Sequence, residues 1–175
     1  MRFLPLFVFL LCGLCSINKV TAQQKVAYIN SEELFIVMPE MKAAEATFQT
    51  FQKQKQLQLE QMDAELQKKV ASYQEKYKTL SEANREVVEK ELNVLGADIE
   101  NIRKRLDENG QKAQQEVQEK QEQLYAPILE KAQNAIKSVA KEKGYAYVLD
   151  VAQPGIVHFE GDNLLATVKL KLGIQ

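Results

Sequence analysis

The chain of 175 residues lacks tryptophan, has a single histidine and has only two cysteines, both within residues 1–22. This segment has the parts of a cleaved export signal: Arg2, an apolar stretch and the small-residue pattern Val20-Thr21-Ala22. We therefore expect residues 1–22 to be a signal peptide and Gln23 to begin the mature protein. A mature chain without cysteine excludes disulfides, thiolate nucleophiles and cysteine metal sites.

Two other interpretations of the apolar stretch fit less well. A transmembrane anchor needs about 20 apolar residues, whereas Phe3–Ile17 is shorter and contains Pro5. A lipoprotein has a small residue before the modified cysteine, and here leucine precedes both Cys12 and Cys15. The sequence thus predicts a soluble protein outside the cytoplasm.

An excess of positive charge is also lacking. Without Arg2 and Lys19 the basic residues fall from 23 to 21 against 24 acidic ones, a formal charge of −3. A mildly acidic chain has no general electrostatic attraction for nucleic acid. His158 cannot form a histidine metal cluster alone, and we expect it on an exposed strand face. The sequence predicts no catalytic, cofactor-binding or metal site, and hence no enzyme.

Several short charged motifs have an ordinary explanation. Glu32-Glu33 and Asp107-Glu108 are carboxylate pairs, but neighbours on a helix point in different directions. Lys68-Lys69 and Arg103-Lys104-Arg105 are basic, with acidic residues interleaved nearby. No glycine-rich phosphate loop or dinucleotide-binding motif is present. We interpret these residues as parts of solvated helix faces.

Glycine and proline are scarce between residues 41 and 143, where only Gly96, Gly110 and Pro127 occur among strong helix formers. Before this zone, "KVAYIN" (25–30) predicts a strand, and "SEEL" predicts a short helix with Ser31 as its N-cap. Pro39 separates that short helix from the long helical zone.

After Gly144 the pattern changes to strands. Residues 145–150 and 155–159 are β-prone runs separated by Gln153-Pro154-Gly155. "DNLLATVKLKLGI" then predicts a terminal helix capped by Asp162 or Asn163.

The helical zone contains two runs of apolar residues at steps of three and four, which is coiled-coil spacing. If the runs are the arms of an antiparallel hairpin, facing residues have a constant sum of residue numbers, because both helices rise equally per residue. The sum is 165 for Tyr77 with Val88 and for Tyr73 with Leu92. It is also 165 for the pairs Val70 and Leu95, Leu66 and Ile99, Leu59 and Leu106, Phe48 and Val117, and Met41 and Leu124. The chain should therefore reverse between Glu82 and Ala83.

Each predicted arm is about 40 residues, so the hairpin should project roughly 60 Å. Its apolar seam is narrow, and the clearest large apolar residues outside it are Leu57, Val87 and Val94. The seam is imperfect where Lys55 is expected to face Gly110 and Ala44 to face Lys120. A glycine inside a helix costs about 1 kcal/mol relative to alanine. We expect the arm to be flexible at Lys55 and Gly110.

The predicted fold class is α+β: a long antiparallel coiled-coil hairpin that projects from a small β-sheet body. The arm covers 41–124 with its turn near 80–85, and the body combines 23–40 with 125–175. The hairpin returns the chain to its start, which brings "GYAYVLD" beside "KVAYIN" in one sheet. A body of about 70 residues is marginal alone and its strand edges need cover, so we expect oligomerisation through the sheet.

The order of these features resembles the Skp/OmpH family of periplasmic chaperones. The resemblance covers the export signal, "KVAYINSEEL", the Gln/Glu/Lys-rich hairpin, "AIKSVAKEKGYAYVLD" and "DNLLATVKLKL". It implies a homotrimer in which three arms enclose a cavity for unfolded outer-membrane proteins, without ATP or another cofactor. This chain is slightly acidic where the best-known members are strongly basic, so the resemblance gives no ground to expect binding of lipopolysaccharide or anionic lipid through a general positive field.

The resemblance predicts an ATP-independent periplasmic holdase. For such a function, the apolar residues outside the seam, Leu57, Val87 and Val94, are the candidate client contacts. Flexible arms with scattered apolar groups make many weak contacts, and three arms add avidity. Its partners would be unfolded outer-membrane proteins and other copies of the chain, with at most transient membrane contact. The alternative is a periplasmic scaffold, which would need straight, well-packed seams and a specific docking patch.

Overall fold

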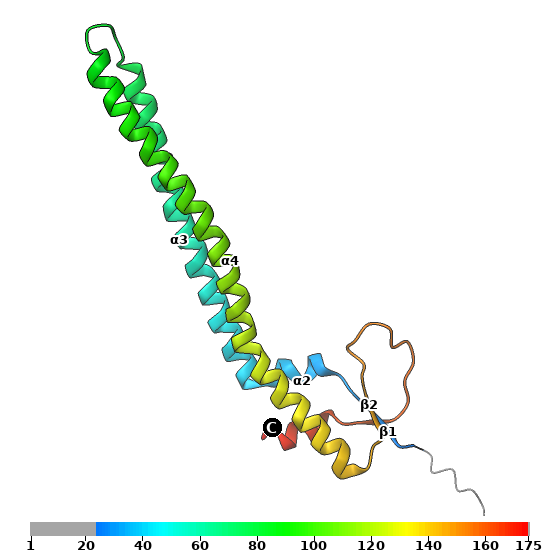
Figure 1. Cartoon of the computed structure of the whole chain (residues 1–175). Helices are drawn as coiled ribbons and strands as arrows, with labels where there is room; N and C mark the ends of the chain where they lie inside the picture. The colour runs from blue at the N-terminus through cyan, green and yellow to red at the C-terminus, as the bar shows by residue number, and fades with distance from the viewer. Residues whose placement is uncertain (1–23, 175) are drawn as a thin grey trace, which may run out of the picture.

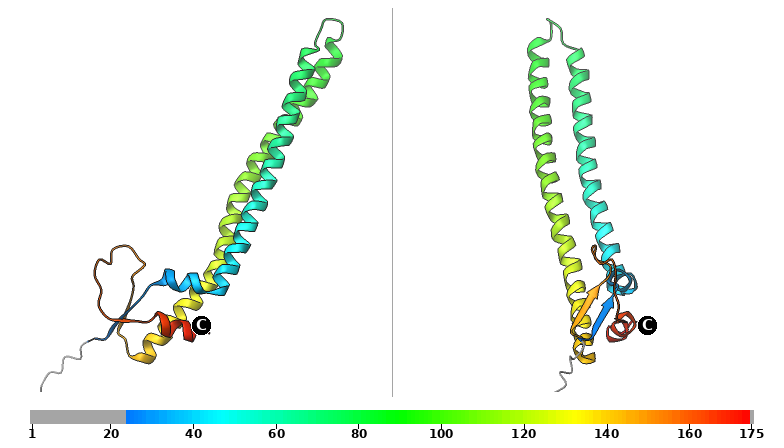
Figure 2. Two further views of the ribbon diagram at one scale, coloured as in Figure 1. Left: turned by 180° about the vertical axis from the view of Figure 1, so that it is seen from behind. Right: turned by 90° about the vertical axis from the view of Figure 1, so that its right-hand side faces the viewer.

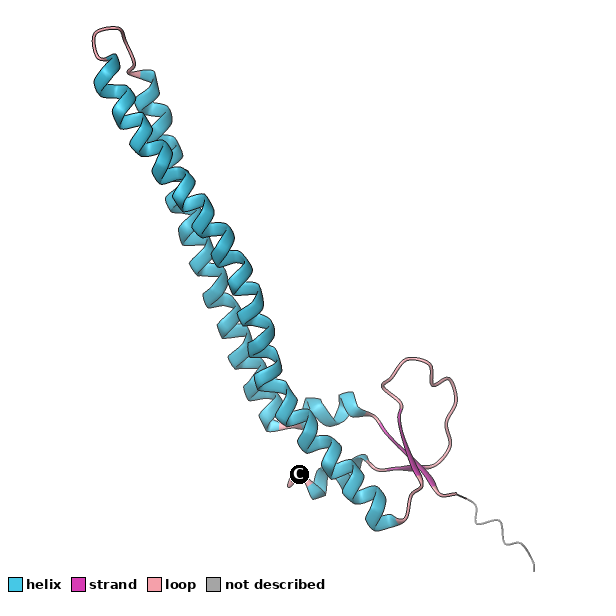
Figure 3. Cartoon of the chain, viewed as in Figure 1, coloured by secondary structure: helices cyan, strands magenta, loops and turns pink. Residues whose placement is uncertain are grey.

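A computed structural model describes residues 24–174 of the chain, and the predicted signal peptide (1–22) lies outside the described residues. Two long helices form an arm, and the strands gather with two short helices in a body at its base (Figure 1, Figure 3). The elements in chain order are β1 (Val26–Ile29), α2 (Ser31–Val37), α3 (Pro39–Lys78), α4 (Arg85–Lys143), β2 (Tyr147–Asp150), β3 (Asp162–Asn163) and α5 (Leu165–Lys171).

The arm is an antiparallel pair formed by α3 and the first part of α4, and the two helices stay side by side along its length (Figure 2). The 40 residues of α3 correspond to about 60 Å. The chain reverses over residues 79–84. There the Asn84 side chain accepts a hydrogen bond from the Ser81 amide (2.8 Å) and donates one to the Thr79 carbonyl (2.8 Å). The predicted fold class is confirmed.

The seam between the two helices is mostly as the spacing predicts. The buried seam residues of α4 within the arm are Val88, Leu92, Ile99, Ile102 and Ala113. Tyr73 is half-buried and packs near Gly96, where an added Cβ atom would lie 3.9 Å from its ring. The placement of Tyr77 on the seam is wrong, because its side chain is 60% exposed. Tyr77 is the second-last residue of α3, next to the turn at 79–84.

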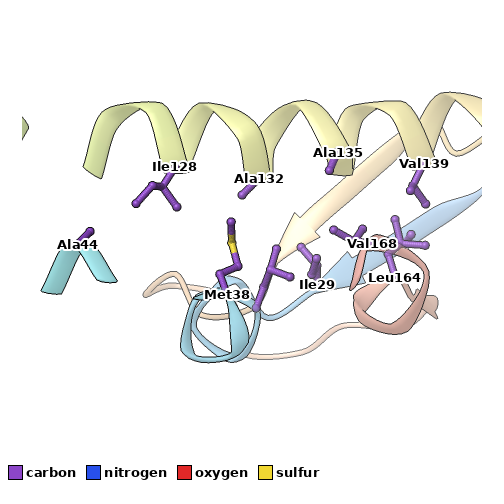
Figure 4. Packing of buried hydrophobic residues seen from close by; sticks show 11 residues of the cluster. Ile29, Met38, Ala44, Ile128, Ala132, Ala135, Val139, Leu164 and Val168 are labelled. Carbon is purple, nitrogen blue, oxygen red and sulfur yellow. The ribbon is translucent and has the colours of Figure 1, made fainter. Parts of the chain in front are cut away.

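The core of the body uses the last part of α4, which runs unbroken from the arm into the body, together with the short helices α2 and α5. Pro127 lies inside α4 and is exposed. Beyond it, one face of α4 presents apolar side chains to the body core (Figure 4). These core residues of α4 are Ile128, Ala132, Ala135 and Val139. The two alanines are small, which allows the sheet and Met38 to approach α4 closely.

The three-stranded sheet has the order β2-β1-β3, with both pairs parallel. Val26 aligns with Tyr147, and Tyr28 aligns with Leu149. The prediction that "KVAYIN" and "GYAYVLD" lie beside each other in one sheet is therefore confirmed. Ala27 and Ile29 are buried on the helix-covered face. Because side chains alternate along a strand, Tyr28 lies on the opposite face, where no helix of the described chain covers the sheet.

The cap of α2 differs from the prediction, because Asn30 and not Ser31 is the N-cap. The Asn30 Oδ1 atom accepts hydrogen bonds from the amides of Glu32 (3.1 Å) and Glu33 (3.3 Å). Ser31 is buried, and its amide donates to Asp150 Oδ1 (3.1 Å) at the end of β2. The register of β1 with β2 therefore places the serine one position inside the helix.

The predicted strand at 155–159 is also wrong, since these residues belong to a loop between β2 and β3. The second edge of β1 is already taken by β3, so a single chain offers this run no neighbouring strand there. Gly161 passes so close to β1 that a Cβ atom there would lie 2.6 Å from the Val26 carbonyl oxygen. Directly after Gly161, the chain pairs with β1 as strand β3.

The cap of the terminal helix is corrected for the same reason. Asp162 and Asn163 pair with β1 and cannot begin a helix, so Leu164 takes the cap position of α5. Asn163 still contributes to the helix start, because its Oδ1 atom accepts a hydrogen bond from the Leu165 amide (2.8 Å).

Candidate functional site

The candidate functional surface is the outside of the arm, which stands apart from the body over most of its length (Figure 1). The three apolar residues singled out from the sequence lie there. The exposed fraction of Leu57 is 46%, and Val87 and Val94 are each 62% exposed. Leu57 lies on α3 and the two valines lie on α4. The polar surface of the arm thus carries isolated apolar side chains from both helices.

Lys55 lies on the arm but does not contact Gly110. Its ammonium forms an ion pair with Glu116, a carboxylate that also has Lys112 at 3.9 Å. The Lys55 Nζ atom lies 5.3 Å from the centre of the Phe51 ring, within reach of a cation–π interaction. A polar cluster therefore occupies the seam where the sequence suggested only a packing defect.

The second expected mismatch, Ala44 opposite Lys120, is not present. Ala44 is buried in the body core together with Ile128. Lys120 instead lies 6.0 Å from the ring centre of Phe51, which is seven residues nearer the tip of α3 than Ala44. The base of the arm is consequently better packed than the sequence suggested.

Gly110 has open space around it, since an added Cβ atom would meet nothing within 4 Å. We expect Gly110→Ala to raise the free energy of unfolding by about 1 kcal/mol, because alanine has the higher helix propensity and no clash opposes it. Urea unfolding followed by circular dichroism measures the change. Gly161→Ala is the contrasting variant and should destabilise, because its Cβ atom would strike backbone of β1. A stability loss in Gly110→Ala would contradict the expectation.

Charged and hydroxyl groups link the two helices at several levels. Lys69 pairs with Asp98 (2.6 Å) and Lys76 with Glu91 nearer the tip. At the base of the arm, Lys131 pairs with Glu40. Nearby, the Tyr125 hydroxyl donates to Glu45 (2.5 Å), and the Tyr125 ring meets Phe48 edge-on at 5.8 Å.

Sequence reasoning missed these cross-arm contacts. A search for opposite charges with residue numbers adding to about 165 would have found the pairs near the tip, which both add to 167. It would have missed those near the base, where long side chains reach a turn further along the partner helix.

Three glutamates that form cross-arm contacts toward the base, Glu40, Glu45 and Glu116, have lowered pKa values. A hydrogen bond from Lys55 lowers the pKa of Glu116 below its usual value, and one from Lys131 does the same for Glu40. Burial, reinforced by the hydrogen bond to Glu45, raises the pKa of Tyr125 to about 12. The arm is thus cross-linked in the state where the glutamates are charged and Tyr125 is neutral.

These shifts predict the pH dependence of stability. A carboxyl whose folded pKa is depressed contributes stability that is present above its unfolded pKa of about 4.3 and lost as pH falls through the folded value. A tyrosine whose folded pKa is raised loses its contribution as pH rises from about 10 toward 12. The midpoint temperature of thermal unfolding should therefore be nearly constant from about pH 5 to 9 and should fall at lower and at higher pH. Lys55→Gln should make the fall of the midpoint temperature at acid pH smaller, and Tyr125→Phe should make the fall at alkaline pH smaller.

Within residues 24–174, no group of three His, Cys, Asp or Glu side chains is placed to hold a metal ion. His158 is exposed and lies 3.6 Å from Glu160. The basic run of α4 is largely matched by acids, because Arg103 pairs with Glu100 (2.9 Å) and Lys104 with Glu108 (3.8 Å). None of the helices in this part of the chain is long and apolar enough to cross a membrane.

Comparison with known proteins places this geometry in context. The family described as "Outer membrane protein (OmpH-like)" matches residues 25–172. The chain is 30% identical over 150 residues to "Chaperone protein Skp" of Photorhabdus luminescens, covering 84% of each chain. It is 26% identical over 131 residues to the protein of the same name from Pectobacterium atrosepticum, covering 75% of each.

A solved structure supports the fold independently. A protein of Caulobacter crescentus described as an OmpH-like outer membrane chaperone superimposes with a TM-score of 0.65 at 16% sequence identity. The match covers 85% of this chain and 83% of that one. Because the family match spans every helix and strand of the described residues, from β1 to α5, the resemblance drawn from the sequence is confirmed, and the chain belongs to the Skp/OmpH family of chaperones.

Proposed function

We propose that the protein is an ATP-independent holdase of the periplasm, which shields unfolded outer-membrane proteins from aggregation before their insertion. The observation that carries this proposal is the arm itself, about 60 Å of solvated helix pair with scattered apolar side chains. A client strand exposes alternating apolar residues. It needs many weak contacts that shield it from other chains and still release it.

The proposal includes a homotrimer joined through the uncovered face of the sheet. On that face Tyr147 is 57% exposed, and Leu149 and Phe159 are partly exposed beside it. Phe159 packs on Tyr28, with ring centres 4.6 Å apart, and Val157 of the same loop is 99% exposed. A contiguous apolar face of this kind is expected to pack against another subunit. Three arms projecting from one trimeric body would multiply weak client contacts into useful affinity.

The proposed client contacts are Leu57, Val87 and Val94. Each side chain supplies at most about 1.5–3 kcal/mol even when fully covered, and a mobile client covers only part of it. Changing any one to serine should therefore weaken suppression of client aggregation only slightly. The triple serine variant should weaken it clearly, because the losses accumulate on every arm.

Light scattering of an unfolded barrel protein diluted from urea measures this effect. The matched control is the triple variant Gln61→Ser, Asn93→Ser and Gln118→Ser, which places serine at exposed polar positions of the same helices. The control variant should suppress client aggregation to the same extent as the wild-type protein does. Complete loss of activity from a single serine would instead indicate one specific docking site and favour the scaffold alternative.

A further inference from the structure

A shallow groove lies on the side of the arm, about halfway along it. It is formed by Leu59, Glu60, Asp63, Ala64 and Gln67 of α3 together with Leu106 of α4, and its volume is about 680 Å³. We call these six residues the mid-arm groove. Its apolar residues are Leu59, Ala64 and Leu106, of which the two leucines are half-buried. Glu60 and Asp63 are exposed acids, which we call the rim acids.

Cross-arm ion pairs lie on both sides of the groove. Lys55–Glu116 lies nearer the body and Lys69–Asp98 nearer the tip. The two lysines are 14 positions apart on α3, which is about 21 Å of helix. Moving one heptad from Lys69 and Asp98 places Met62 opposite Arg105, a pair that cannot form an ion pair. The groove therefore lies in a stretch that no cross-arm ion pair of the described chain bridges.

The groove also has an unbalanced charge. Residues 56–67 of α3 contain three acids, Glu60, Asp63 and Glu65, and no lysine or arginine. The facing stretch of α4, 99–110, has three acids and three basic residues, so these 24 residues carry a formal charge of −3, as much as the whole predicted mature chain.

The two rim acids are held only by neutral neighbours. Gln56 donates to Glu60 (2.8 Å) and Gln67 donates to Asp63 (3.3 Å). Within residues 24–174 neither acid has a basic side chain within ion-pair distance. Their negative charge is thus available to a cation that comes from outside the chain.

We propose that the mid-arm groove binds extended client segments in which an apolar side chain lies close to a lysine or arginine. The apolar side chain covers Leu59 and Leu106, and the cation meets Glu60 and Asp63. These acids are three positions apart on one helix face, about 5–6 Å between their Cβ atoms, so one cation reaches both. This inference rests on the holding function proposed above and specifies which client segments the arm prefers.

The test uses the full-length mature protein and a pair of short fluorescent peptides in which leucines alternate with lysines or, in the twin, with glutamates. Fluorescence anisotropy at low salt should show tighter binding of the lysine peptide. The variant Glu60→Gln/Asp63→Asn should weaken that binding roughly fivefold, the size expected of two exposed ion pairs. Raising the salt concentration should remove most of the difference between the peptides.

The matched control is Glu119→Gln/Glu122→Gln. It removes the same charge from two exposed acids with the same spacing, on the arm but outside the groove, and Glu119 likewise accepts a hydrogen bond from a glutamine. This variant should change the affinity by less than about twofold. If both variants lost the same affinity for the lysine peptide, the proposed groove site would be wrong, and the general negative charge of the arm would explain the preference. Equal binding of both peptides by the wild type would also overturn the groove site.

The failure of this inference is distinguishable from failure of the holding function. Wild-type protein is assayed in parallel for suppression of barrel-protein aggregation by light scattering. Normal suppression without a peptide preference refutes the groove alone, whereas absence of suppression refutes the holding function itself.

Discussion

Removal of residues 55–110, with a short turn inserted in their place, is expected to leave a folded body that no longer prevents client aggregation. The deletion takes away Leu57, Val87 and Val94 and most of the free surface of the arm. If the arms hold the client, loss of that surface should abolish suppression completely.

The body should survive this deletion because its contacts lie outside the removed segment. Its buried core comes from β1, α2, α5, the α4 residues beyond Leu124 and the residues Met38, Ala44 and Leu164. The remaining stump keeps the Tyr125–Glu45 hydrogen bond and the Lys131–Glu40 ion pair, which hold α3 against α4 at the base. Circular dichroism and sedimentation equilibrium verify folding and assembly before the light-scattering assay. Suppression by the armless protein would assign client binding to the sheet body.

The arm is predictable from the sequence because one physical constraint determines it. Two helices that rise equally per residue must pair at a constant sum of residue numbers. Apolar residues such as Val88, Leu92 and Ile99 satisfy that sum, and all three are buried in the seam. The constraint says nothing about helix ends, which explains why Tyr77 is exposed although its spacing fits.

The body is less predictable because its local signals compete. Ser31 is a good N-cap residue by type, but pairing of β1 with β2 places Asn30 at the cap and Ser31 against Asp150. Similarly, residues 155–159 have strand-forming composition, yet β3 takes the position beside β1, and these residues stay in the loop that leads to it. Such choices depend on contacts between segments more than a hundred residues apart.

The candidate site is predictable only in part. Leu57, Val87 and Val94 are exposed as expected, since they fall outside the seam pattern. In the polar cluster, Lys112 and Glu116 have the i,i+4 spacing of a pair on one helix. The cross-arm contact of Lys55 with Glu116 does not follow from that spacing, because it depends on how far the lysine side chain reaches along the partner helix.

The second large effect is expected at the uncovered face of the sheet. Tyr147→Lys together with Leu149→Lys should convert the proposed trimer into single chains at micromolar concentration. Both residues belong to β2, are at least partly exposed and lie outside the buried core of the body, so the changes leave that core untouched. An unpaired lysine buried at each subunit contact costs several kcal/mol, and each 1.4 kcal/mol is a tenfold loss in the association constant.

Sedimentation equilibrium reports the assembly state, and the control is the pair Ile36→Lys and Leu170→Lys. These two residues are also large, apolar and exposed, but they lie on α2 and α5 and not on the sheet. The control should keep a mass near three chains. If the β2 variant also kept this mass, the sheet face would not be the assembly interface. If the wild type sedimented as a stable, folded monomer, the proposed trimer would be wrong.

Dissociation should also abolish holding, although the arm of each chain remains intact. A single arm offers a client only a few partly covered apolar contacts, each worth at most about 1.5–3 kcal/mol before the entropy of ordering the client is subtracted. Three arms on one body keep a released segment close to the other two arms, so the client stays bound although each contact is short-lived. If the dissociated variant suppressed aggregation as well as the trimer, the affinity would have to come from one arm alone, and enclosure by several arms would not be part of the mechanism.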